Sequence, residues 1–542
     1  MDFLPPENHE GNIEYKLKLN NMTDEKFQKR ITQMKFRIDE GIGEAYYHIG
    51  IMDDGTIIGI SLEEFDESKA TLKNMASKLN CCVQIVIERE ITQNKFYGEY
   101  LIRENLNGDY IDIKIGVIGN VDAGKTSTVM ALTRNIKDDG RGKARLLMFN
   151  HKHEIETGRT SSIGHQIVGF DSEGSIVNWK RGERAMVWAD IVNSSTKVVS
   201  FYDLAGHEKY LRTTIYGLTS MHPDYCLVMV GGNMGISMMT REHISLCLTL
   251  KIPFIIIVTK VDIAPENILK ENMHKINQIC KNGAKKVPYH MKTMEDILNA
   301  IKNIRTDSIV PILQISNVTR HNYDLFQALL NFLPIRNDYT KYLNLPAKLQ
   351  VDEVYLVTGH GTIVCGILRE GIVKPSDTLY IGPFSSGEYR PVKVKSIHSN
   401  YRDVKQGNAG SYISLSLKGI QRKEIKKGMI LLGDKNACVA AKEFWAVMTI
   451  LQSHSTTIRV GYEPVVHIQN IRQAVKIKEI VKFKKGISIE ENTPDLKILR
   501  TGDRARVRLE FKSRFEYLEP NLKLIFREGR VKAVGKVLEI II

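Results

Sequence analysis

The chain has 542 residues, of which 43% are hydrophobic and 25% are charged, an ordinary globular composition. This composition excludes a disordered, collagenous or disulfide-scaffold chain, and at about 150 residues per domain the length predicts three or four domains. No apolar run approaches the ~18 residues of a membrane-spanning helix, and the first residues do not resemble a signal peptide. Seven cysteines without a Cys-x-x-Cys spacing indicate reduced thiols. We therefore expect a cytoplasmic protein that does not bind membranes.

The net charge of +14 is unevenly distributed along the chain. Residues 1–110 carry 13 Lys/Arg against 20 Asp/Glu, residues 111–340 carry 28 against 22, and residues 341–542 carry 35 against 20. The positive charge therefore accumulates in the C-terminal part, which favours an anionic partner there, with nucleic acid as the leading candidate. A Lys-, Asn- and Ile-rich composition from an AT-rich genome is the alternative explanation.

The first 110 residues predict a small α+β domain with the element order βαββαββ. The expected elements are 13–19, 23–38, 45–51, 56–60, 61–79, 83–91 and 95–103. The third and fourth elements flank Asp54-Gly55, a common hairpin turn. The domain contains no catalytic constellation, and its net negative charge makes a protein its expected partner.

Beyond residue 110 the pattern changes twice. Near-continuous apolar runs alternate with helices, as expected for a parallel, doubly wound sheet covered on both faces, and the runs are 113–118, 198–202, 226–230, 254–258 and 309–315. A linker follows at 336–346. Short strands then recur at roughly ten-residue spacing, which predicts two β-barrels with a break near residues 434–440. The expected domains are 1–110, 111–338, 339–436 and 437–542.

One phosphate-binding motif stands at the start of the α/β domain. Gly119-Asn120-Val121-Asp122-Ala123-Gly124-Lys125-Thr126 matches G-x-x-x-x-G-K-[ST], between a strand that ends at Ile118 and a helix expected near Lys125. In such a loop, continued by Ser127, backbone N–H groups wrap the β-phosphate. Lys125 would reach the β- and γ-phosphates, and the Thr126 hydroxyl would bind Mg²⁺. The motif alone does not distinguish ATP from GTP.

A second motif, Asp203-Leu204-Ala205-Gly206-His207, follows the strand at 198–202. The Asp203 carboxylate suits a water-mediated hold on Mg²⁺, and the Gly206 N–H can meet the γ-phosphate. His207 is placed to orient the attacking water, although a surface histidine at a helix start is the plainer interpretation. Together with Lys125, these residues make Gly206 and His207 the expected catalytic groups.

Two further segments indicate guanine. Asp262, in Thr259-Lys260-Val261-Asp262, can accept hydrogen bonds from the guanine ring N–H and amine, whereas adenine would leave a buried carboxylate unpaired. The stem of Lys260 can cover the base, and Ser316-Asn317 can offer a backbone N–H to the guanine carbonyl. In this order the elements predict an α/β P-loop GTPase domain that binds GTP and GDP with Mg²⁺.

The long segment between the phosphate loop and Asp203 contains residues 156–164 and few helix or strand signals. Thr160 within it is a candidate second hydroxyl ligand for Mg²⁺, because GTPases use such a threonine to order a loop around the γ-phosphate. Spacing alone does not separate this role from that of any threonine in a polar loop.

These residues resemble the translational GTPases of the elongation factor Tu and elongation factor 1-alpha type, and more narrowly their GTP-binding protein 1 branch. The resemblance extends over nearly the whole chain, through residues 119–126, 157–162, 203–207, 359–366 and 527–535. Residues 15–19, 32–35 and 40–45 also resemble that branch and have no counterpart in ordinary elongation factors.

The resemblance implies a GTPase domain followed by two β-barrels. It implies that the GTP form binds the acceptor end of aminoacyl-tRNA and that the ribosome stimulates hydrolysis. It identifies Thr160 as the switch threonine and His207 as the histidine that ribosomal RNA positions, and it gives Asp122 a role in organising a cation beside the phosphates.

Several positions depart from that family's pattern. Asn120 and Ala123 replace histidines, and Thr259 replaces an asparagine that braces the phosphate loop, which predicts weaker nucleotide binding. Arg159 replaces an isoleucine that helps to keep the histidine from the water. Its guanidinium could instead stabilise charge in the transition state.

Three functions remain open on the sequence. The first is a GTP-gated carrier of aminoacyl-tRNA to the ribosome, with RNA contacts from basic clusters such as 422–427 and 476–485. The second is a GTP-timed adaptor in RNA quality control or mRNA turnover, in which residues 1–110 recruit a protein. A sulfate-activating GTPase subunit fits the first two motifs, but neither the N-terminal region nor residues 157–162 resemble it.

Overall fold

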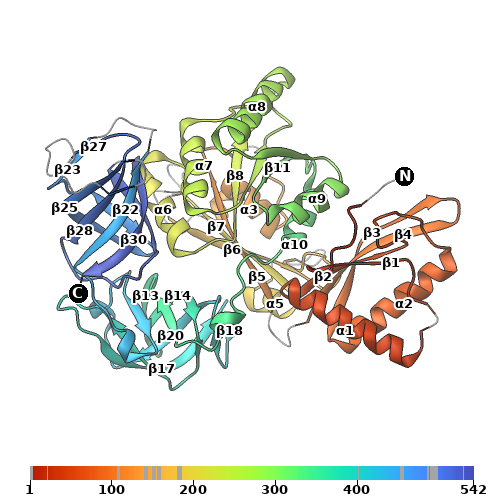
Figure 1. The fold of residues 1–542 in the computed structure, drawn as a ribbon, viewed down its shortest axis with the longest axis horizontal. Coiled ribbons are helices and arrows are strands. Elements are labelled where there is room, and N and C mark those ends of the chain that lie inside the picture. Colours follow the sequence, from red (N-terminus) through yellow and green to blue (C-terminus); the bar gives the residue numbers. More distant parts are fainter. Residues whose placement is uncertain are drawn as a thin grey trace.

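Four sheet-containing regions follow one another along the chain (Figure 1). The N-terminal region lies at one end of the molecule, the two barrels lie at the other, and the central sheet lies between them. This computed structural model describes residues 4–20, 22–105, 110–139, 144–148, 154, 160, 162–179, 186–400, 402–451, 457–484, 487–488, 498–528 and 530–541. Within these residues no helix combines the length and the apolar character needed to span a membrane.

The N-terminal region is a four-stranded sheet with two helices, in the strand order β1-β2-β4-β3. Its elements are β1 (Ile13–Lys16), α1 (Asp24–Glu40), β2 (Glu44–Ile49), α2 (Leu62–Lys78), β3 (Cys81–Thr92) and β4 (Lys95–Glu104). Side chains of Thr23 and Ser61 cap the two helices, as polar residues at these positions predict.

The hairpin predicted around Asp54-Gly55 is wrong in its second strand. Residues 56–60 form no strand and make only isolated bridges, Ile51 to Ile57 and Ile60 to Phe96. Gly59, at a φ of +70°, interrupts the extended conformation between the two bridged isoleucines. The element order is therefore βαβαββ.

The central region contains a seven-stranded sheet in the order β10-β11-β9-β8-β5-β7-β6, and all its pairs are parallel except β6–β7. Its strands are β5 (Ile111–Gly119), β6 (Gly164–Phe170), β7 (Lys197–Asp203), β8 (Tyr225–Gly231), β9 (Phe254–Thr259), β10 (Val287–Met291) and β11 (Ile309–Gln314). Its helices are α3 (Lys125–Thr133), α5 (Trp188–Asn193), α6 (Leu211–Ser220), α7 (Met238–Leu250), α8 (Glu266–Gln278), α9 (Met294–Ile304) and α10 (Tyr323–Phe332).

Two hydrophobic cores cover the two faces of this sheet, and neighbouring residues of one strand alternate between them. Val117 of β5 belongs to one core and Ile118 to the other. The doubly wound, mostly parallel sheet predicted from the five buried runs is therefore confirmed. The edge strands β6 and β10 were not predicted. Strand β10 is largely half-exposed and therefore lacks the continuous apolar run by which buried strands are recognised.

Each C-terminal region closes into a ring of six strands. The first ring runs β12-β21-β16-β17-β20-β14 and closes through β12–β14, and the second runs β24-β29-β30-β22-β28-β25 and closes through β24–β25. The ring strands of the first are β12 (Lys348–Gln350), β14 (Gly361–Glu370), β16 (Thr378–Gly382), β17 (Arg390–Ser399), β20 (Tyr412–Lys418) and β21 (Ile430–Leu432). Those of the second are β22 (Glu443–Ile450), β24 (Val465–Ile468), β25 (Ile471–Lys484), β28 (Arg504–Phe511), β29 (Lys523–Glu528) and β30 (Arg530–Ile541). The two predicted barrels are therefore present.

Buried charges join the N-terminal sheet to the central sheet. Glu44 of β2 accepts hydrogen bonds from Arg103 Nε of β4 at 2.8 Å and from Lys197 Nζ of β7 at 3.3 Å. Arg103 also donates to the backbone oxygen of Asn331, and Lys197 donates to that of Leu333. All three charged side chains are buried; although burial opposes it, the two cations hold the pKa of Glu44 below its ordinary value.

A second buried polar cluster joins the central region to both barrels. Asp352, which follows β12, accepts a hydrogen bond from Asn470 of the second barrel at 2.7 Å and one from Tyr216 of α6 at 3.4 Å, both through Oδ1. Its Oδ2 has no hydrogen-bond partner among the described residues. Burial raises the pKa of Asp352 to about 7, an effect that the nearby Arg369 opposes and Glu353 reinforces.

The raised pKa of Asp352 predicts how stability depends on pH. Because the folded pKa lies above the usual value near 4, the contribution of the protonated carboxyl is complete below pH ~4 and is lost as the pH rises to about 7. Asp352→Asn should therefore stabilise the chain at pH 8 by roughly 4 kcal/mol and leave it unchanged near pH 4. Thermal unfolding at both pH values measures this, with exposed Asp403→Asn as the control. An equal shift at both would contradict it.

Candidate functional site

The loop between β5 and α3 has the backbone geometry that its motif requires. Gly119 and Gly124 have φ values of +142° and +79°, and α3 begins at Lys125. A Cβ on Gly119 would lie 2.3 Å from the backbone oxygen of Met229 on the neighbouring strand β8. The loop can therefore approach the sheet only with glycine at this position.

Lys125 is a buried cation enclosed by this loop. Its Nζ donates hydrogen bonds to the backbone oxygens of Asn120 at 2.8 Å and Gly119 at 3.2 Å. Burial lowers the pKa of Lys125, and the charges of Asp203 and Asp122 oppose that shift. Neutral backbone oxygens thus hold the Lys125 ammonium group in the loop. A negatively charged oxygen can replace them, because it is a stronger acceptor for a cation.

Gly206 makes room for this ammonium group. A Cβ at Gly206 would lie 2.3 Å from Lys125 Nζ and 2.5 Å from the backbone oxygen of Gly119. The two predicted motifs are therefore in contact, and the glycine of the second is needed because the lysine of the first occupies the adjoining space.

Three residues predicted to hold a metal ion lie together beside Lys125. Thr126 Oγ1 donates to Asp203 Oδ2 at 2.5 Å and lies 3.1 Å from Thr160 Oγ1. Asp203 is fully buried, its Oδ1 has no hydrogen-bond partner in the described part of the chain, and burial raises its pKa to about 6. The Asp203 carboxylate and the two threonine hydroxyls are a set of hard oxygen donors of the kind that Mg²⁺ prefers.

A buried carboxylate that sequence reasoning missed approaches this cluster. Glu154 Oε1 accepts hydrogen bonds from both the N–H and the hydroxyl of Ser162 at 3.0 Å, and its negative charge adds to the raised pKa of Asp203. No motif or spacing in the sequence marks this glutamate as a partner of Ser162. Arg159, and residues 157, 158 and 161, lie outside the described residues.

His207 begins a short helical turn, Glu208–Tyr210, directly after Gly206. Its Nδ1 accepts a hydrogen bond from the backbone N–H of Lys209 at 3.1 Å, so that Nε2 is the ring nitrogen left for another partner. The side chain is half-buried. His207 thus does cap a helical start, as the plainer interpretation expects, and this cap also fixes the direction of its ring.

The segments expected to read guanine brace the phosphate loop from the other side. Thr259 Oγ1 donates to the backbone oxygen of Ala123 at 2.9 Å, and Thr259 is fully buried. Asn317 Oδ1 accepts hydrogen bonds from Thr128 of α3 at 3.2 Å and from Tyr323 at 2.6 Å. Thr259 therefore supplies a loop contact although it is not the asparagine of the family pattern.

The positions expected to contact the base differ in exposure. Asp262 is exposed, so the expectation of a buried carboxylate is wrong for the chain without nucleotide. Selectivity for guanine over adenine therefore requires the bound base to exclude water from this carboxylate. Lys260 is half-buried in the loop after β9. The Ser316 N–H donates to the backbone oxygen of His321, which leaves the Asn317 N–H as the donor for a guanine carbonyl.

Comparisons with known proteins agree with this arrangement. The elongation factor Tu GTP binding domain matches residues 112–335, and elongation factor Tu domain 2 matches residues 361–432. GTP-binding protein 1 of Xenopus laevis is 38% identical over 546 residues, covering 100% of this chain and 81% of that protein. GTP-binding protein 2 of Mus musculus is also 38% identical, covering 99% of this chain and 88% of that protein. A solved structure of translation elongation factor SelB from Methanococcus maripaludis has a TM-score of 0.54 at 17% identity and covers 80% of each chain, which shows a shared fold.

The brace from Thr259 predicts a measurable effect on nucleotide affinity. Thr259→Ala removes the hydrogen bond to Ala123 and should weaken GDP binding about fivefold, since a neutral hydrogen bond contributes about 1 kcal/mol. Thr259→Ser keeps the hydroxyl and is the matched control. Equilibrium titration with a fluorescent GDP measures both variants, and equal affinity of the two would show that the hydroxyl contributes nothing.

Proposed function

The chain belongs to the family of elongation-factor-Tu-type GTPases, and we propose that it is a cytoplasmic translation factor that engages aminoacyl-tRNA and the ribosome in its GTP form. GTP binding and the GTPase class follow from the family. The observation that carries the proposal is the contact of Thr126, Thr160 and Asp203, because it joins the segment before β6 to the phosphate loop and to the end of β7.

The nucleotide would lie along residues 119–127, with Lys125 Nζ released from the carbonyl oxygens of Gly119 and Asn120 to the phosphates. Thr126, Thr160 and Asp203 would hold a magnesium ion, which when bound neutralises phosphate charge. Asp262, Lys260 and the Asn317 N–H would contact the base. Thr160 reaches this cluster from a segment that can carry the nucleotide state to the surface.

Hydrolysis needs a water molecule aligned with the γ-phosphate. We assign that role to the Nε2 of His207, since Nδ1 is engaged by the Lys209 N–H and the ring direction is thereby set. The Gly206 N–H would meet the γ-phosphate beside Lys125. A half-buried histidine at the domain surface is accessible to a partner that completes its orientation, which suits a GTPase activated by a large assembly.

The RNA part of the proposal is supported by a cluster of arginines between the central region and the second barrel. Arg212 lies on α6, five residues after His207, while Arg472 and Arg527 lie on β25 and β29. Burial lowers the pKa of Arg472 and of Arg527, and the charge of Arg212 lowers both further. Guanidinium groups that repel one another in this way favour a bound polyanion such as an RNA backbone.

Three lysines of the basic clusters predicted from the sequence are weaker candidates for RNA contacts. Lys427 forms an ion pair with Glu353, Lys478 with Glu510 and Lys482 with Asp503. These cations are therefore neutralised in part by neighbouring strands, as expected for a solvated barrel surface.

A GTP-timed adaptor in RNA quality control or mRNA turnover is the second candidate. The observation that favours it is the buried Glu44–Arg103–Lys197 cluster, which fixes the acidic N-terminal region to β7, the strand that ends at Asp203. A protein bound to residues 1–110 would then act on the same strand that contributes to the nucleotide site.

Titration with RNA tests the proposal. The full chain bound to a non-hydrolysable GTP analogue should bind aminoacyl-tRNA more tightly than uncharged tRNA, and both more tightly than in GDP. Arg212→Glu should weaken this binding about tenfold or more, because it removes a phosphate contact and adds repulsion. Lys405→Glu on the first barrel is the control of equal charge change. Equal binding of charged and uncharged tRNA in both nucleotide states would overturn the carrier role.

The role of His207 has its own test. His207→Ala should leave GTP affinity within about twofold and lower the ribosome-stimulated single-turnover rate by about 10²-fold or more, because the water loses its orienting group. Rapid-quench measurements with ribosomes give the rate, and fluorescent nucleotide gives the affinity. A loss of affinity with an unchanged bound-state rate would mean that the histidine is only the cap of its helical turn.

A further inference from the structure

The first barrel carries a sheet edge that its ring does not cover. Strand β14 pairs through residues 361–365 with β13 (Glu353–Val357) and through residues 368–370 with β12, and only β12 continues to β21. Strand β13 therefore stays outside the ring, and within the described residues its strand partner is β14 alone. Sheet edges of this kind are templates for another strand, and proteins usually cover or charge them.

The outer strand is apolar where it is most exposed. Its last residues, Tyr355, Leu356 and Val357, have exposed fractions of 50%, 70% and 39%. Leu356 lies opposite Thr362 of β14, which lies opposite Leu417 of β20, so the three side chains share one face of the sheet. Thr362 and Leu417 are buried, and Leu356 is exposed because no ring strand lies beyond β13.

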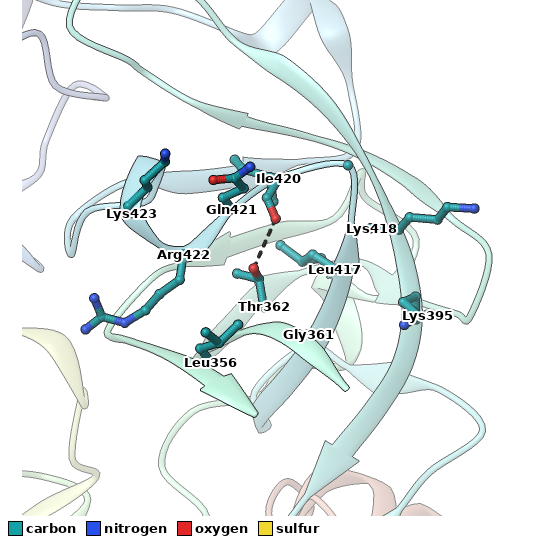
Figure 2. Close-up of a pocket in the computed structure, with 11 residues that line it drawn as sticks. Leu356, Gly361, Thr362, Lys395, Leu417, Lys418, Ile420, Gln421, Arg422 and Lys423 are labelled. Atoms are coloured by element: carbon teal, nitrogen blue, oxygen red, sulfur yellow. Dashed lines mark hydrogen bonds between the residues drawn. The ribbon is translucent and has the colours of Figure 1, made fainter. Parts of the chain in front are cut away.

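A cavity of about 770 Å³ adjoins this edge (Figure 2). Leu356, Leu417 and Ile420 form its apolar lining. The hydroxyl of Thr362 donates to the backbone oxygen of Ile420 at 3.0 Å and so fixes the segment after β20 against the barrel. The volume is within the range of cavities that accept a bulky side chain or a small ligand.

Four cations surround the cavity. Lys395 and Lys418 lie on one side of it in Figure 2, and Arg422 and Lys423 lie on the other. None of the four forms an ion pair with a carboxylate in the described ranges of the chain. The neighbouring acids are engaged elsewhere.

The two neighbouring acids, Glu424 and Glu353, form ion pairs with other cations. Glu424 accepts from Arg390 at 3.0 Å, and Glu353 pairs with Lys427 at 2.5 Å. The surroundings of the cavity are therefore positive, while its lining is apolar.

We propose that this site, formed by β13, the cavity and the four cations, binds an extended acidic peptide with a bulky apolar side chain. The side chain fills the cavity, carboxylates of the peptide meet the cations, and its backbone continues the sheet at β13. A polynucleotide can place phosphates at the cations and a base in the cavity, but it has no backbone amides to pair with the exposed edge of β13, which favours a peptide. The proposed tRNA contacts lie elsewhere, at Arg212, Arg472 and Arg527.

Binding of a defined peptide to the full chain tests the proposal. A fluorescein-labelled octapeptide of alternating Glu and Leu should bind saturably, as followed by anisotropy. The double variant Arg422→Glu/Lys423→Glu should weaken binding about tenfold or more, and Leu356→Asp should have a similar effect. The double variant Lys374→Glu/Lys405→Glu reverses two exposed charges of the same barrel away from the cavity and should bind as the unmodified chain does. An unchanged far-ultraviolet circular dichroism spectrum and thermal unfolding midpoint verify that each variant is folded.

A peptide N-methylated at alternate residues tests the strand pairing separately. It keeps the side chains and the charge but cannot donate hydrogen bonds to β13, so it should bind several-fold more weakly. Absence of saturable binding, equal affinity of cavity and control variants, or equal affinity of the N-methylated peptide would overturn the proposal. Binding of a single-stranded oligouridylate that displaces the peptide and shows the same dependence on Leu356 would overturn it in favour of an RNA site.

Discussion

A buried ammonium group determines the geometry of the nucleotide site. Lys125 lies inside the loop that its own motif forms, and backbone oxygens of Gly119 and Asn120 accept its hydrogen bonds. A cation withdrawn from water must be compensated on every side, so the residues around it have little freedom. Gly206 has no side chain because Lys125 Nζ occupies that space, and Asp203 supplies the opposite charge. The two sequence motifs are thus two halves of one enclosure.

The same principle joins the rest of the molecule to that enclosure. Strand β7 begins at Lys197, a buried cation compensated by Glu44 of the N-terminal region, and it ends at Asp203. Helix α6 follows His207 and contacts Asp352, the buried acid at the junction with the barrels. Strand β7 and helix α6 lie on the two sides of the phosphate site. Each therefore contacts a buried ionisable group that is shared with another region. Removing one partner of the Glu44–Arg103–Lys197 cluster would leave a buried charge uncompensated, which keeps the N-terminal and central regions in fixed relation.

Much of the fold and site could be predicted from the sequence, because the signals are local. The phosphate loop, the start of α3, the buried strands and the two barrels each have a pattern within one window of sequence, and the structure contains all of them. What could not be predicted depends on distant contacts. Asn317 braces Thr128 from 189 residues away, and Arg103 reaches Asn331 across 228. No spacing rule finds Glu154, and no local pattern distinguishes Thr259 as a brace from Thr259 as a filler of the core. A local signal can also mislead. Asp54-Gly55 predicts a hairpin, but residues 56–60 form no strand because Gly59, with a positive φ, interrupts the extended backbone.

The buried cluster of Glu44, Arg103 and Lys197 also affects the order in which the regions fold during synthesis. The N-terminal region leaves the ribosome first, but its Glu44 and Arg103 reach their complete set of partners only after Lys197, Asn331 and Leu333 have been made. Until then the Glu44–Arg103 pair, which is buried in the complete protein, is exposed to water on this face of the newly synthesised domain. The region that is synthesised first is therefore completed only after residue 333 has been made, and until then it has a charged surface for a nascent-chain chaperone to protect.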